Sequence, residues 1–113
     1  MAQNSRESDL MRATRRFLQE VELGVRAANR KVIGKMIPSL DREAFLRLAL
    51  AVARLRASYL EAVMGTNWED PSPGLIELRK RREIYEEALR AFDALERSIE
   101  RGYVAIDEKP KTE

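Results

Sequence analysis

Apolar positions recur at helical spacing along most of the chain and predict three helices. In the first, near residues 8–36, the seam advances in steps of three and four through Met11, Thr14, Leu18, Val21, Val25, Ala28 and Val32. In the last, near residues 73–103, large apolar residues fall seven apart, at Leu78, Tyr85, Phe92, Ile99 and Ile106. Such spacings place side chains on one face of an α-helix. We therefore expect each of these helices to pack one face against another helix.

The middle helix, residues 40–64, is apolar almost all the way round. Its polar side is a narrow stripe formed by Arg47, Arg54 and Glu61. A helix with so little polar surface is typical of a buried position. A bundle of only three helices leaves part of every helix exposed, so the surplus predicts contact with a second copy in an isologous dimer. The residues expected to make this contact are Leu46, Leu50, Ala53, Ala57, Leu60 and Met64.

Proline, glycine and capping residues predict where the helices end. Pro38 ends the first helix because the residue before a proline disfavours the α conformation. Ser39 is then the expected N-cap of the second helix, which ends at Gly65. A loop follows, and Ser72 with Pro73 predicts the start of the third helix.

The two ends of the chain are expected to differ from the helical centre. Gly102 is a predicted C-cap, after which Tyr103, Val104 and Ile106 form a short apolar segment that folds back. Residues 1–7 and 107–113 are polar and are expected to be disordered tails. No strand pattern is visible.

These elements predict an all-α fold in one domain, residues 1–113. The short first connection makes the first two helices antiparallel neighbours. The longer second loop reverses the chain again, which gives an up-down-up three-helix bundle with parallel first and third helices. We expect this bundle to assemble into a homodimer.

Composition restricts the chemistry of the protein. The chain has 113 residues, a formal net charge of +2, no cysteine and no histidine. Thiolate chemistry, imidazole catalysis and imidazole metal ligation are therefore excluded. We expect no enzyme activity, no cofactor and no metal site. The N-terminus lacks the apolar segment of a signal peptide, and charged residues interrupt the longest apolar run, so a cytoplasmic protein without a membrane span is expected.

A basic cluster is a possible anion-binding site. In the predicted bundle, the starts of the first and third helices lie at the same end, where helix N-termini add positive partial charge. The arginines expected to converge there are Arg12, Arg15, Arg16, Arg79 and Arg82. An alternative interpretation is an ordinary solvated surface, because Arg16–Glu20, Arg79–Glu83 and Arg82–Glu86 are spaced for ion pairs within a helix.

Trp68 is the only tryptophan and lies in the long loop. It is either a partner anchor or, as we favour, an aromatic residue that folds back over the end of the helices.

The pattern as a whole favours a non-catalytic protein that acts through protein–protein contacts, as an adaptor, regulatory or self-assembling module. A nucleic-acid or polyanion binder that uses the basic end is the alternative.

Overall fold

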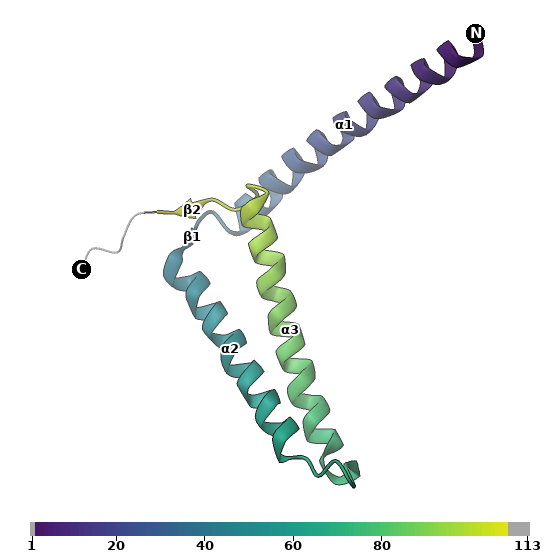
Figure 1. Cartoon of the computed structure of the whole chain (residues 1–113). Coiled ribbons are helices and arrows are strands. Elements are labelled where there is room, and N and C mark those ends of the chain that lie inside the picture. Colours follow the sequence, from purple (N-terminus) through teal and green to yellow (C-terminus); the bar gives the residue numbers. More distant parts are fainter. Residues whose placement is uncertain (1, 109–113) are drawn as a thin grey trace.

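The computed structural model describes residues 2–108. Within them the chain is mostly helical, which confirms the all-α prediction (Figure 1). The elements are α1 (Ala2–Met36), β1 (Leu40–Asp41), α2 (Arg42–Gly65), the short 3₁₀ helix η1 (Ser72–Gly74), α3 (Leu75–Glu100) and β2 (Ile106–Asp107).

Helices α2 and α3 form an antiparallel hairpin, called the hairpin below (Figure 1). Two aromatic pairs span it. The rings of Phe45 and Phe92 stack with centroids 4.9 Å apart, and those of Tyr59 and Tyr85 lie 6.1 Å apart. Val52 lies between these levels of α2 and is only 5% exposed. Tyr85 and Phe92 of the seam predicted for the third helix therefore pack against α2, whereas Ile106, the last residue of that seam, lies beyond the end of α3.

The N-cap of α2 is Asp41, so the prediction of Ser39 is corrected. The Asp41 carboxylate Oδ1 accepts a hydrogen bond from the Ala44 backbone N–H at 2.7 Å. The helix begins later than the sequence suggested because Leu40 and Asp41 are extended and pair with β2. An Asp with an extended backbone, three residues before the bonded amide, is a favourable N-cap.

The C-terminal end of α3 closes in a Schellman motif around Gly102. The Gly102 N–H donates to the Ile99 carbonyl at 3.0 Å, and the Tyr103 N–H donates to the Ser98 carbonyl at 2.8 Å. Gly102 has a φ of 74°, the left-handed conformation that glycine adopts without strain. In the apolar segment that follows, Tyr103 and Val104 are buried, whereas Ile106, which was predicted to fold back with them, lies in β2 and is 55% exposed.

A two-residue parallel ladder joins the segments that flank the hairpin, and the sequence did not predict it. Leu40 pairs with Ile106, and Asp41 pairs with Asp107. The Leu40 N–H also donates to the Ala105 carbonyl at 2.9 Å. A ladder this short has no alternating pattern to detect. Asp107 therefore belongs to a strand and not to a tail, while residues 109–113 lie outside the described residues.

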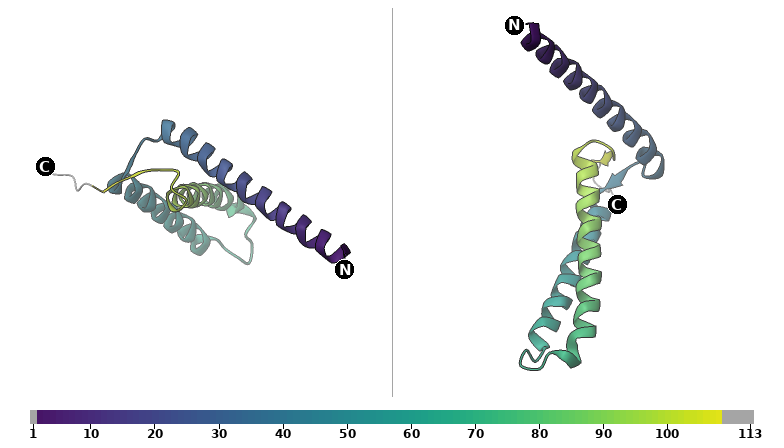
Figure 2. Two further views of the ribbon diagram at one scale, coloured as in Figure 1. Left: turned by 90° about the horizontal axis from the view of Figure 1, so that it is seen from above. Right: turned by 90° about the vertical axis from the view of Figure 1, so that its right-hand side faces the viewer.

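Helix α1 projects away from the hairpin, so a single chain does not form the three-helix bundle (Figure 2). Within the part of the chain that the structure describes, α1 meets the rest of the molecule through its C-terminal part, where Arg30 Nε donates to the Gly102 carbonyl at 3.3 Å. Residues 37–39 connect α1 to β1, and the β1–β2 ladder fixes the position of β1. This short connection holds the C-terminal end of α1 beside the C-terminal end of α3. Residues 2–7, which were predicted to be part of a tail, continue α1; Met1 lies outside the described residues.

The molecule is consequently extended and thin. Its radius of gyration is 22.9 Å and its principal extents are 70 × 51 × 18 Å. A compact domain of this length has a radius of gyration of about 13 Å. The smallest extent is less than two helix diameters of roughly 10–12 Å each. One copy therefore has little room for an interior.

Candidate interaction surface

One side of α2 presents a continuous apolar surface, called the outer face below. All the residues that the sequence assigned to self-association lie on it and are exposed: Leu46, Leu50, Ala53, Ala57, Leu60 and Met64. They advance in alternating steps of four and three, so they form one straight stripe along the helix. Met64 is 84% exposed and Leu46 57% exposed. The stripe is therefore open to solvent along its whole length.

The outer face is exposed because α3 covers only the opposite side of α2. Phe45, Val52 and Tyr59 point to α3, and they recur every seven residues. Among residues 2–108, no other helix packs against the outer face, since α1 lies elsewhere. Helix α2 thus has two apolar sides, and the polar stripe seen in the sequence separates them at one edge.

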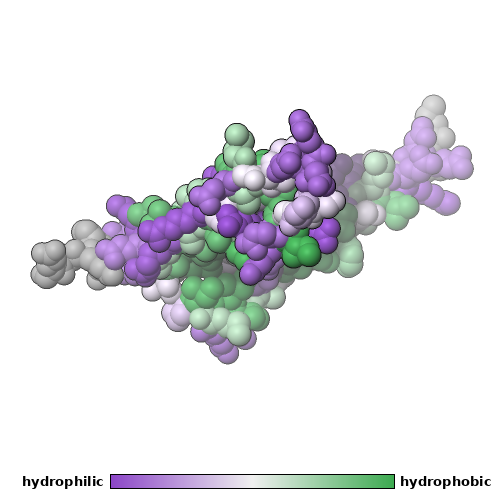
Figure 3. Space-filling view, turned by 90° about the horizontal axis from the view of Figure 1, so that it is seen from below, coloured by the Kyte–Doolittle hydropathy of each residue, from purple (hydrophilic) through white to green (hydrophobic). Residues whose placement is uncertain are grey.

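Helix α1 presents a second apolar surface. The seam predicted from the sequence does not meet another helix: Met11, Leu18, Val25 and Val32 are all exposed. Leu10 and Phe17 beside it are exposed as well. A Cβ atom added at Gly24 would have no neighbouring atom within 4 Å, so none of the described helices packs closely against this position. Apolar side chains accordingly reach the surface between charged ones (Figure 3).

The total exposed area shows how unusual this is for a single folded chain. The accessible surface is 9688 Å². A compact monomer of 13.0 kDa exposes about 6,300 Å². The accessible surface of this chain therefore exceeds the value for a compact monomer by roughly half, and the exposed side chains of α1 and α2 contribute to the excess.

The two arginine groups predicted to form an anion site do not come together. Arg12, Arg15 and Arg16 lie on the projecting part of α1, whereas Arg79 and Arg82 lie near the start of α3, at the opposite end of the molecule (Figures 1 and 2). The prediction required α1 to run alongside α3, and α1 instead points away. Arg82 pairs with Glu86 at 3.3 Å within its own helix, as the alternative interpretation expected.

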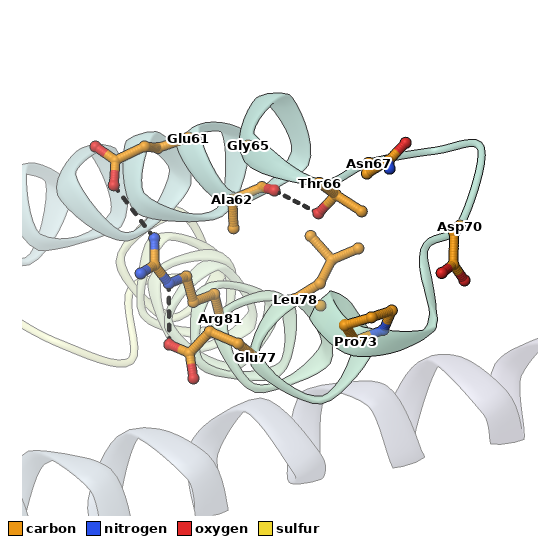
Figure 4. A pocket seen from close by; sticks show the side chains of 11 residues that line it. Glu61, Ala62, Gly65, Thr66, Asn67, Asp70, Pro73, Glu77, Leu78 and Arg81 are labelled. Carbon is orange, nitrogen blue, oxygen red and sulfur yellow. Dashed lines mark hydrogen bonds and ion pairs between the residues drawn. The ribbon is translucent and has the colours of Figure 1, made fainter.

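A shallow pocket at the connected end of the hairpin contains Arg81, which is not among the arginines that were expected to converge on an anion (Figure 4). Arg81 reaches Glu77 at 3.1 Å, Glu61 at 3.4 Å and the Ser58 carbonyl at 3.1 Å. Arg81 donates hydrogen bonds to the carboxylates of Glu77 and Glu61, and these bonds, above all the one to Glu77, raise the pKa of Arg81. The Arg81 side chain links α3 to α2. Its positive charge is compensated by the carboxylates of Glu77 and Glu61, so the pocket holds no uncompensated arginine charge. The i,i+4 spacing of Glu77 and Arg81 was the only signal in the sequence.

Trp68 folds back onto the end of α2. Its indole N–H donates to the Val63 carbonyl at 2.9 Å, while the residue remains 58% exposed. Thr66 caps the neighbouring Ala62 carbonyl through its hydroxyl at 2.7 Å. Trp68 thus helps to terminate the helix, and much of its ring still faces solvent.

No protein family model, curated protein or solved structure matched this chain. Among residues 2–108, no helix has the length and apolar character needed to cross a membrane. The same residues contain no group of three or more acidic side chains placed to hold a metal ion.

Proposed function

We propose that this protein works through protein–protein contacts, as a self-assembling helical module whose contact surface is the outer face of α2. The observation that carries the proposal is the unbroken exposed stripe from Leu46 to Met64 on a helix whose other side is already packed. Contiguous apolar surface of this kind marks interaction sites on soluble proteins.

The available area is sufficient for a stable assembly. A standard interface buries about 800 Å² on each partner, and obligate dimers bury 1,000–2,500 Å² or more on each, in round terms. The extended chain exposes roughly 3,400 Å² more than a compact monomer, counting apolar and polar atoms together, so its total surface does not limit an interface of this size. A homodimer therefore has enough surface to cover without any further partner.

Sedimentation velocity of the full chain at micromolar concentration tests the proposal. We expect a species with twice the 13.0 kDa mass of one chain. Ala53→Arg should shift it to the monomer, because a buried charge without a partner opposes association. The matched control is Arg47→Glu, which changes a charge at the polar edge of the same helix. A wild-type protein that sediments only as a monomer would refute self-assembly.

A further inference from the structure

Each chain carries two unpartnered apolar surfaces, one on α1 and one on α2. We use the word arm for residues 2–21 of α1, the part beyond its contacts with the end of α3. At 1.5 Å per residue the arm is about 30 Å long, and the outer face from Leu46 to Met64 is about 28 Å long. The apolar part of the arm, from Leu10 to Val21, is about 18 Å long, roughly three turns, so one arm can cover more than half of the outer face.

The two stripes also share one periodicity. The arm advances through Met11, Thr14, Leu18 and Val21 in steps of three and four, as the outer face does. Steps that average 3.5 residues keep two helices in contact by knobs-into-holes packing along their full length. All the large apolar residues of this stretch of the arm are exposed, including Leu10 and Phe17 at its side.

An arm cannot reach the outer face of its own chain. Arg30 is bonded to the Gly102 carbonyl, and three residues, 37–39, connect α1 to the β1–β2 ladder. These contacts fix the base of α1 so that the helix leaves the hairpin and projects into solvent (Figure 1). An arm held in this way meets an outer face only on another molecule.

We propose that the arm of each copy packs on the outer face of a second copy, so that a reciprocal exchange completes a three-helix bundle on both hairpins. A second copy is the occupant because each chain supplies one arm and one face that it cannot bring together itself. Two chains related by a two-fold axis then pair both arms with both faces, and the assembly is closed. A different partner would cover one stripe and leave the other exposed.

This inference rests on the proposed self-assembly and specifies its geometry. Three arrangements are possible for a dimer: arm on face, face on face, and arm on arm. Leu18→Glu in the arm and Leu50→Glu on the face separate them, because both residues are exposed in the single chain and neither change disturbs the packing of the hairpin. Circular dichroism of each variant alone should show that the helices outside the arm keep the helicity of the wild type.

Sedimentation velocity of each variant alone and of an equimolar mixture is the decisive experiment. With arm on face, each variant alone raises the dissociation constant about 100-fold or more, because every junction contains one buried charge. In the mixture, the normal arm of the Leu50→Glu chain meets the normal face of the Leu18→Glu chain. The mixture should therefore form dimers that neither variant forms alone, although weaker than those of the wild type.

The other arrangements give different patterns. Face-on-face dimers tolerate Leu18→Glu, and arm-on-arm dimers tolerate Leu50→Glu. In both of these arrangements, mixing the two variants yields no more dimer than the tolerated variant forms by itself. Leu23→Glu is the matched control, since Leu23 is exposed on the side of α1 away from the seam and its replacement should leave the dimer intact. A dimeric wild type without recovery on mixing overturns arm exchange alone, whereas a monomeric wild type overturns self-assembly as well.

Discussion

At the scale of single residues, the end of α3 depends on one glycine. Gly102 adopts a φ of 74°, and an added Cβ would meet only the end of the Arg30 side chain, at 3.5 Å. Gly102→Ala therefore has room, and its cost is the left-handed backbone, about 1–2 kcal/mol of the free energy of unfolding. Urea unfolding followed by circular dichroism measures it. Gly65→Ala is the control: Gly65 is the last residue of α2 and has free space around it, so this change should not lower stability. Equal losses for both variants would contradict this account.

The helix start at Asp41 offers a second residue-scale test, because the sequence pointed to a different residue. Asp41→Ala removes the carboxylate that accepts the Ala44 N–H and should cost about 1 kcal/mol. Ser39→Ala should cost little, because no helix begins there. The same urea unfolding measurements compare the two variants, and a larger loss at Ser39 would show that α2 starts where the sequence suggested.

At the scale of elements, the sequence predicted the helices well and their partners less well. Periodicity located three helices to within a few residues, apart from the longer start of α1, and the seam through Phe92 found its partner α2. The seam through Leu18 indicated a packed helix equally clearly, yet within one chain it faces solvent. An apolar stripe indicates that a helix packs against a partner, but it does not indicate whether that partner belongs to the same chain. The anion site failed for the same reason, since it depended on where α1 lies.

Two features of the site escaped sequence analysis because they depend on contacts distant along the chain. The β1–β2 ladder joins segments more than sixty residues apart, and each strand has only two residues. Arg81 contacts Glu61 and Ser58 across the hairpin, at positions that become neighbours only once α2 and α3 pair in a particular register. The exposed residues of the outer face of α2, by contrast, could be assigned to one side from the sequence because they lie within one continuous helix, and their role in self-association stays a prediction.

At the scale of the whole molecule, stability and assembly should be linked. Within the described residues, the buried apolar side chains of one copy are Val52, Tyr103 and Val104, and so small a core contributes little to folding. If dimer formation supplies the remaining burial, dilution favours the unfolded chain by mass action. We expect the Tm of the wild type to fall by roughly 5–10 °C over a hundredfold dilution, given the size of a dimer that unfolds as one unit.

Leu50→Glu should have a lower Tm that does not change with concentration, whereas Arg47→Glu should keep the wild-type dependence. Differential scanning calorimetry over this concentration range measures all three. A constant Tm for the wild type would mean that the hairpin and α1 are stable with their apolar stripes in water, and that assembly contributes nothing to the fold.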